Sequence, residues 1–157
     1  MAMVGVPGVK AHQELYHNIE MDLSMFERTR TVGVSFTIHA PELLMDPSQA
    51  ARAMYDSRWL KSRGDGELKR LVSLARVHLA DRFTLSFEEG APLDLAGETT
   101  FGNLDELRNG EERGLSPACI QAWLELKVPP GAHALHVKHS AHSEKRLMLV
   151  VQRPNDF

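Results

Sequence analysis

The chain has 157 residues, a formal charge of -3, and 43% hydrophobic and 25% charged residues. This length and this globular composition support one hydrophobic core, so we expect a single folded domain and not a disordered or fibrous chain. The two signs of charge are interspersed and form no basic stripe, which argues against nucleic acid as a partner. No run of apolar residues approaches the length of a membrane-spanning helix, so we expect no transmembrane segment.

Residues 1–11 precede the first patterned segment and are rich in Val, Gly and Ala. They are too short, and too broken by Gly5, Pro7 and Gly8, to hold the basic and apolar regions of a signal peptide. They are therefore either the remnant of an export signal or tag, or a flexible leader. We expect the folded domain to span residues 12–157, and an export remnant would place it in the periplasm or elsewhere outside the cytoplasm.

Two segments near the start of the chain alternate apolar and polar residues with the period of a half-buried strand. Residues 18–26 carry apolar side chains at every second position, and residues 31–40 repeat this pattern. Because only a short connection separates them, we expect an antiparallel hairpin with one face of each strand in the core.

The period then changes, and residues 46–82 are predicted to be a helical insertion. Asp46 is placed to cap a helix that begins at Pro47 and runs to about Lys61. Asp65 is the cap candidate of a second helix, in which apolar residues recur at intervals of three, four and seven. That spacing predicts one apolar stripe that packs against a sheet. The stripe consists of Leu68, Leu71, Val72, Ala75 and Leu79.

The second half of the chain returns to the period of strands. Alternation is clear at residues 83–87 and again at residues 118–128. Residues 93–115, which lie between them, are rich in Gly and acidic residues and predict a long loop with one weak edge strand. The last two strands, residues 134–141 and 145–153, are separated by a short turn, so we expect them to pair as a hairpin.

About six or seven short strands without β-helix-β alternation favour a mainly β fold over a doubly wound sheet. We therefore predict an antiparallel, Ig-like or Greek-key β-sandwich with a two-helix insertion between its second and third strands. The insertion would cover one end or flank of the sandwich.

The most unusual feature of the sequence is a histidine at every third position from His133 to His142. Imidazole binds copper, nickel and zinc, so this segment is a candidate metal site. A period of three matches neither face of a strand, so the four rings cannot all converge in an extended segment. We expect His139 on the core side, His136 toward solvent and His142 in the turn. The simpler interpretation is a set of surface histidines that binds no metal.

A second metal hypothesis begins with His12. Cleavage after Ala11 would make His12 the amino terminus, and an amino group with its own imidazole nitrogen chelates copper. His17, His39 or a late histidine would then supply another imidazole. The alternative is an ordinary histidine in a frayed terminus. The candidate metal ligands are therefore His12, His136, His139 and His142, and the candidate metals are copper, nickel and zinc.

The sequence contains no recognisable catalytic motif. His-Glu-x-x-His, Gly-x-Ser-x-Gly and a phosphate-binding glycine loop do not occur. We expect Cys119 on the outward face of its strand with no basic neighbour to lower its thiol pKa, which argues against a nucleophile. Trp59 and Tyr55 either pack on the core or form a partner-binding patch, and core packing is the simpler reading. We assign no catalytic or cofactor-binding residue and expect a non-enzymatic protein.

Several features of the layout occur together. They are a histidine-led start at His12, paired strands through Met21 and Val34, a helix that runs into a strand within residues 67–87, and a Pro-Pro-Gly step within residues 126–132. In this layout the chain resembles the extracytoplasmic β-sandwich region of HupE/UreJ-type nickel and cobalt transporters and of related orphan periplasmic proteins. The resemblance covers most of the chain and implies an exported accessory or sensor-like domain connected with a transition metal. It identifies no functional residue.

These observations lead to three hypotheses. The first is a non-enzymatic extracytoplasmic (periplasmic) binding or accessory domain, related to a transition metal and partnered by a membrane-transport protein. The second is a protein-protein interaction or self-association module that forms a homo-oligomer or binds a partner through edge strands or its helical flank, without a small-molecule ligand. The third is a copper or zinc metalloenzyme, which requires three converging ligands and an open coordination position.

Overall fold

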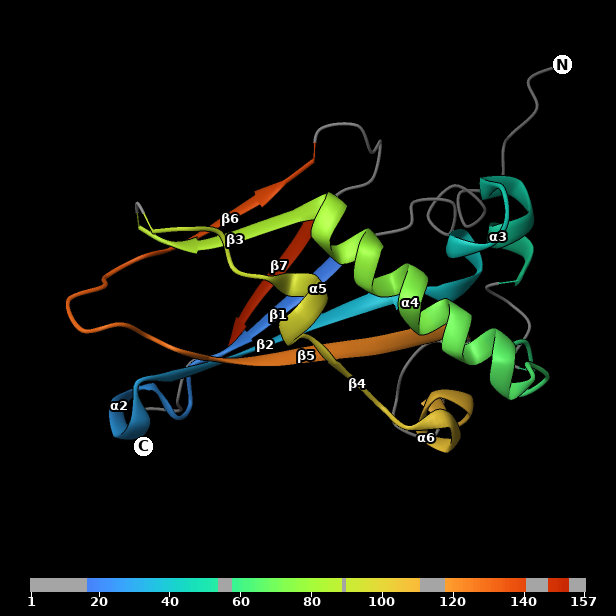
Figure 1. Cartoon of the computed structure of the whole chain (residues 1–157), viewed down its shortest axis with the longest axis horizontal. Coiled ribbons are helices and arrows are strands. Elements are labelled where there is room, and N and C mark those ends of the chain that lie inside the picture. Colours follow the sequence, from blue (N-terminus) through green and yellow to red (C-terminus); the bar gives the residue numbers. More distant parts are fainter. Residues whose placement is uncertain (1–16, 54–57, 89, 111–117, 141–146, 153–157) are drawn as a thin grey trace, which may run out of the picture.

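The computed structural model describes residues 17–53, 58–88, 90–110, 118–140 and 147–152, which are coloured in Figure 1. The elements in chain order are β1 (His17–Asp22), α2 (Phe26–Thr29), β2 (Thr31–His39), the 3-10 helix η1 (Ala40–Leu43), α3 (Pro47–Ala53), α4 (Asp65–Arg82), β3 (Phe83–Phe87), α5 (Leu95–Glu98), β4 (Thr100–Phe101), α6 (Leu104–Arg108), β5 (Cys119–Lys127), β6 (Leu135–His139) and β7 (Leu147–Gln152). They form a mixed α/β fold with one five-stranded and one two-stranded sheet.

The five-stranded sheet is built around β2, in the order β4-β5-β2-β1-β7. β2 pairs antiparallel with β1 on one side and with β5 on the other, so the predicted pairing of the first two strands is confirmed. Alternation along β2 separates two faces of the sheet, because successive side chains point to opposite sides. The residues between Val32 and Ile38 are alternately buried and half-buried. The buried residues of the strand are Val32, Val34, Phe36, Ile38 and His39.

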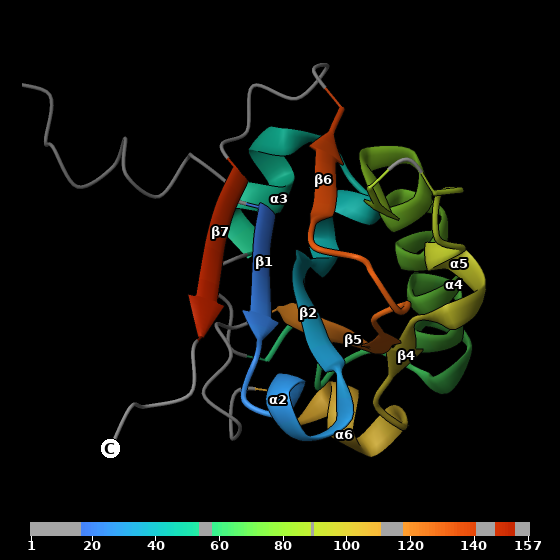
Figure 2. The same ribbon diagram turned by 90° about the vertical axis from the view of Figure 1, so that its left-hand side faces the viewer.

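The two-stranded sheet of β3 and β6 and the long helix α4 lie on the same side of the five-stranded sheet, as Figures 1 and 2 show from two directions. Phe83 of β3 packs against Phe36 of β2, with ring centroids 5.4 Å apart. The predicted apolar stripe of α4 faces the core, since Leu68, Leu71, Ala75 and Leu79 are buried and Val72 packs beside them. The core therefore lies between the sheet and a second layer of mixed composition.

A single arginine of α4 anchors the segment that has no clear period in the sequence. Arg76 Nη1 donates hydrogen bonds to the carbonyl oxygens of Ala96 at 3.1 Å and Thr99 at 2.5 Å. Its guanidinium also lies over the ring of Phe101, 5.0 Å from the centroid, where a cation is attracted by the aromatic quadrupole. The weak edge strand predicted within residues 93–115 is confirmed as β4, but the short helices α5 and α6 flank it where only loop was predicted.

The two predicted helix caps have different outcomes. Asp46 caps α3, because its Oδ1 accepts hydrogen bonds from the backbone N–H groups of Ser48 at 3.0 Å and Gln49 at 3.1 Å. Asp65 is not a cap: the N-cap of α4 is Gly64, and the Asp65 carboxylate pairs with Arg108 instead. The prediction that the first helix runs to Lys61 is wrong, since α3 ends at Ala53 and the described residues before Lys61 form a turn.

The structure corrects the prediction of a mainly β chain. Two α-helices, α3 and α4, do lie between the second and third strands, as predicted, but the fold is mixed α/β. The closed Ig-like or Greek-key sandwich is not confirmed, because the layer opposite the five-stranded sheet consists of α4 and only two strands.

The predicted hairpin of the last two strands is wrong. β6 pairs antiparallel with β3, whereas β7 pairs parallel with β1 at the edge of the large sheet. A period of two identifies a strand and its two faces but carries no information about its partner. Proximity in the sequence favours a hairpin, and here the contacts with β1 and β3 override that preference.

We expect the contact between the two layers to dominate stability. Replacing Phe36 by Ala removes a buried ring from β2 and its contact with Phe83, so the free energy of unfolding should fall by about 3–5 kcal/mol. Val77, which is 56% exposed on α4, provides the control, since Val77→Ala should change stability by less than about 0.5 kcal/mol. Urea unfolding followed by circular dichroism measures both. Equal losses in the two variants would contradict the assignment of the core.

Candidate functional site

The structure places two of the four predicted metal ligands and does not bring them together. His136 and His139 both lie in β6, but a separation of three residues puts them on opposite faces of the strand, His136 exposed and His139 half-buried. His12 and His142 lie outside the described residues. Among the residues that are described, no three His, Cys, Asp or Glu side chains are grouped to hold a metal ion. Metal binding therefore stays a prediction.

His139 is on the core side of β6, as expected from the sequence. Its ring lies against Phe83, with centroids 5.1 Å apart. Burial lowers the pKa of the His139 imidazole, and the positive charge of Arg82 lowers it further. These contacts favour a neutral ring that packs beside an aromatic side chain.

Cys119 and His39 are cross-strand partners at the ends of β5 and β2, a pairing that sequence reasoning missed. Their side chains are 8% and 7% exposed. Burial raises the pKa of the Cys119 thiol to about 11, and the nearby carboxylate of Glu42 adds to this shift. The thiol is therefore protonated at neutral pH, which is the opposite of the state that a cysteine nucleophile requires.

The raised pKa of Cys119 predicts slow alkylation. The rate of reaction with iodoacetamide should stay low through neutral pH and increase as pH rises toward about 11, because only the thiolate reacts. The same chain unfolded in urea should react with an ordinary thiol profile near pH 8.5. Mass spectrometry of the labelled protein over a pH series follows both rates. A native midpoint at or below that of the unfolded chain would disprove the buried, protonated thiol.

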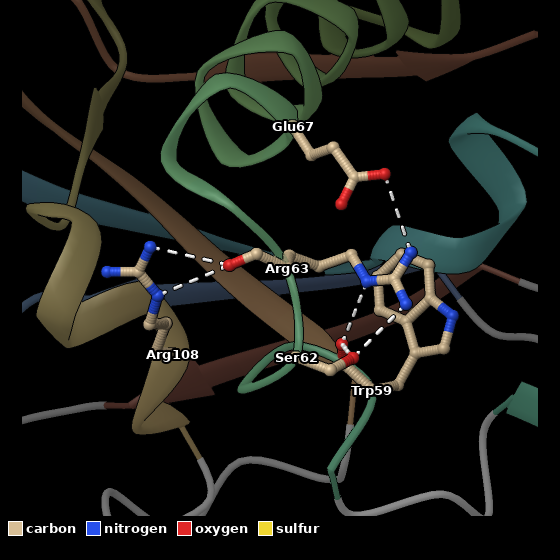
Figure 3. A network of polar contacts seen from close by, with 5 residues as sticks. All are labelled: Trp59, Ser62, Arg63, Glu67 and Arg108. Carbon is tan, nitrogen blue, oxygen red and sulfur yellow. Dashed lines mark hydrogen bonds and ion pairs between the residues drawn. The ribbon is translucent and has the colours of Figure 1, made fainter.

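A network of polar contacts lies just before α4, where it is seen in Figure 3. The guanidinium of Arg63 stacks over the indole of Trp59 at 4.8 Å and donates from Nε to the Trp59 carbonyl oxygen at 3.1 Å. Arg63 also donates to the Ser62 hydroxyl at 3.1 Å and pairs with Glu67 at 3.5 Å. Trp59 is only 8% exposed, so its predicted core packing is confirmed, whereas Tyr55 lies outside the described residues.

Arg108 joins the short helix α6 to this network. Its Nε and Nη2 donate to the carbonyl oxygen of Arg63 at 3.4 Å, and Nη2 also pairs with the carboxylate of Asp65. A weaker ion pair with Asp105 has an N···O distance of 3.6 Å. Nε, Nη1 and Nη2 of Arg108 are all engaged by these contacts, so we interpret the cluster as a clamp between α6 and α4 and not as a binding site for an anion.

The clamp predicts a defined pH dependence of stability. The hydrogen bond and charge of Arg108 lower the pKa of Asp65 below its usual value of 3.8. A lowered folded pKa stabilises the protein above the unfolded pKa, and this stabilisation is lost as pH falls through the folded value. Asp65→Asn should therefore lower the melting temperature near neutral pH but have a shrinking effect below pH 3.8. When Arg108 is already replaced by Gln, the change in melting temperature caused by Asp65→Asn should no longer depend on pH. If that pH dependence persists, Arg108 does not cause it.

The face of the five-stranded sheet that points away from the core has a different character. Its middle row crosses four strands, where Thr100 pairs with Trp123, Trp123 with Ser35, and Ser35 with Glu20. Residues directly opposite in an antiparallel pair share a face. Trp123 is 37% exposed, and its two cross-strand neighbours are small. A large aromatic side chain thus stands on the open side of the sheet.

The next row of this face carries two exposed carboxylates. Gly33 of β2 lies between them, since its cross-strand partners are Asp22 on β1 and Glu125 on β5. The Oδ1 of Asp22 accepts a hydrogen bond from the Ser24 backbone N–H at 2.8 Å, and its hydrogen bonds with Ser24 lower the pKa of the Asp22 carboxyl. Asp22 is therefore ionised at neutral pH. The row is acidic at both sides and has a glycine between them.

The ends of the open face are bounded by short helices. In Figure 1, α2 and α6 lie near the two ends of the sheet, and no helix of the described residues crosses the middle of this face. Beside α6, a small hollow of about 20 Å³ is bordered by Leu107, Cys119 and Trp123. It has the size of a single water molecule. Trp123 therefore lies beside α6 on one side and remains 37% exposed.

A larger hollow lies between the connection that follows β3 and the connection that follows β5. Its volume is about 560 Å³, and it is open to solvent. Glu88 is the carboxylate in its lining, and its Oε1 accepts a hydrogen bond from the His133 backbone N–H at 2.5 Å. The lining is otherwise apolar, so it offers little to orient a ligand. The lining residues are Phe87, Glu88, Gly90, Ala91, Leu93, Pro129, Pro130, Gly131 and Ala132.

Comparison of the chain with protein-family models, with curated proteins and with solved structures found no match. The resemblance to the extracytoplasmic region of HupE/UreJ-type transporters therefore stays a prediction. Of the helices in the described part of the chain, none has both the length and the apolar character needed to cross a membrane.

Proposed function

We propose that this chain is a non-enzymatic binding domain that recognises another protein through the open face of its five-stranded sheet. The observation that supports this proposal is the position of Trp123, which is 37% exposed in the middle row of that face. The open face is defined by the outward residues of β1, β2, β4 and β5. His39 and Cys119 lie at one end of this face and are buried. Its exposed or half-buried residues are Glu20, Asp22, Thr31, Gly33, Ser35, Thr37, Thr100, Gln121, Trp123, Glu125 and Lys127.

The arrangement around Trp123 resembles the centre of a protein interface. Tryptophan is enriched among the residues that contribute most to binding, because one side chain buries a large area and loses few rotamers. Ser35 and Thr100 flank the indole across the two neighbouring strands, and both are too small to cover it. The polar residues around it can supply hydrogen bonds to a partner at the rim of such a contact.

The same face argues against other ligand classes. The exposed carboxylates of Asp22 and Glu125 repel phosphate groups, so nucleic acid and anionic lipid are disfavoured as partners. The metal hypothesis draws no support from the described residues, because His136 and His139 point to opposite sides of β6. An extracytoplasmic location and a membrane-transport partner stay predictions, and both are compatible with a protein-binding face.

Site-specific photocrosslinking tests this proposal. The protein is expressed in its native organism with the photoreactive residue benzoylphenylalanine at position 123. Irradiation should then give a discrete crosslinked protein. The same residue at position 77, which is exposed on α4, is the matched control and should give none. A crosslinked product at both positions with equal yield, or at neither, would contradict a specific partner on the open face.

A further inference from the structure

We infer that the partner presents a cationic, extended segment to the open face, with one basic side chain over Trp123 and others beside Asp22 and Glu125. The inference rests on the proposed function and identifies the chemistry of the partner. The glycine at the centre of the face, the spacing of the rows and the charges around them support it.

Neither the backbone conformation at Gly33 nor its surroundings require a glycine. It is not among the described glycines with positive φ, and a Cβ built at this position would meet its nearest neighbour, the Asp22 Cβ, at an ordinary contact distance of 3.5 Å. Glycine in the interior of a strand weakens the sheet, and often marks a place where another backbone approaches closely. At Gly33, no side chain stands between those of Asp22 and Glu125, so another backbone can approach the strand there.

The spacing of the rows suits a segment in an extended conformation. Trp123 and Glu125 are two residues apart on β5 and share one face, which places them roughly 6.5–7 Å apart along the strand. Alternate side chains of an extended peptide have the same spacing. A peptide that runs along β5 can therefore place one basic side chain on the indole and the next beside a carboxylate.

The charges of the face determine which side chains these are. Asp22 and Glu125 are exposed and acidic, and Lys127, at the far end of β5, is the one basic residue among the outward residues that define the face. A lysine or arginine over an exposed indole is attracted by the electrons of the ring, and neighbouring carboxylates add to this attraction. A neutral or acidic segment gains neither contribution. The face therefore selects for positive charge and not only for apolar area.

Binding of defined peptides tests the inference. The probe is a fluorescein-labelled, acetylated and amidated peptide of alternating lysine and serine, and matched peptides carry glutamate or glutamine in place of lysine. Fluorescence anisotropy at low salt should show binding of the lysine peptide at least about tenfold tighter than of either other peptide. Added salt should weaken this binding, because the charges are exposed.

Variants of the face locate the binding. Trp123→Ala should weaken binding of the lysine peptide about fivefold, and Glu125→Lys should weaken it about tenfold or more. Val77→Ala, on the exposed side of α4, should leave the affinity unchanged. Urea unfolding of each variant shows that the fold is intact. Unchanged affinity in Trp123→Ala or Glu125→Lys would overturn the inference, as would equal binding of the three peptides.

The outcome separates this inference from the proposed function. If position 123 crosslinks to a protein but the lysine peptide binds no better than the glutamine peptide, the face binds a protein whose segment is not cationic. Both proposals fail together if position 123 gives no crosslinked protein and the face binds a neutral sugar instead. In that case a neutral oligosaccharide such as cellohexaose would quench tryptophan fluorescence, and the lysine peptide would not. Selective binding of the lysine peptide, lost in Trp123→Ala, supports the inference.

Discussion

The apolar contact between the inner face of the five-stranded sheet and the layer formed by α4 and β3 holds the rest of the structure in place. Phe36 and Phe83 meet at the centre of this contact, and the stripe from Leu68 to Leu79 extends it along the helix. In the described residues a second layer covers one face of the sheet, and no helix covers the middle of the other. The binding surface that we propose lies on this second face.

The elements that the sequence predicts well are those whose own residues repeat with a regular period. The alternation along β2 and the stripe of α4 are local patterns, and both segments fold as their periods indicate. Strand partners are not local: β7 joins β1 in parallel because of contacts between distant segments. The segment between β3 and β5 has no period of its own, and it is held in place by Arg76, which reaches it from α4. Its position depends on this tertiary contact, whereas its short helices begin at local caps, Asp94 for α5 and the capping box of Asn103 and Glu106 for α6.

The candidate site illustrates the same limit. The histidines between His133 and His142 were the most visible pattern in the sequence, but an interval of three residues divides them between the faces of a strand, as His136 and His139 show. The exposed position of Trp123 was detectable in principle, because it occupies a polar position of the alternation in β5, between Gln121 and Glu125. A tryptophan on the polar side of a half-buried strand indicates an exposed aromatic side chain, which is not part of any catalytic or metal-binding motif.

Solubility explains part of the composition of the open face but not all of it. An uncovered sheet needs polar side chains that discourage non-specific association, and Ser35 and Thr37 serve this purpose while keeping good strand geometry. That requirement does not call for an exposed indole at Trp123, which increases the tendency to associate, or for Gly33, which weakens the central strand. Both residues act against the stability or solubility of the isolated domain. A partner that covers the indole and approaches the backbone at the glycine accounts for both residues together.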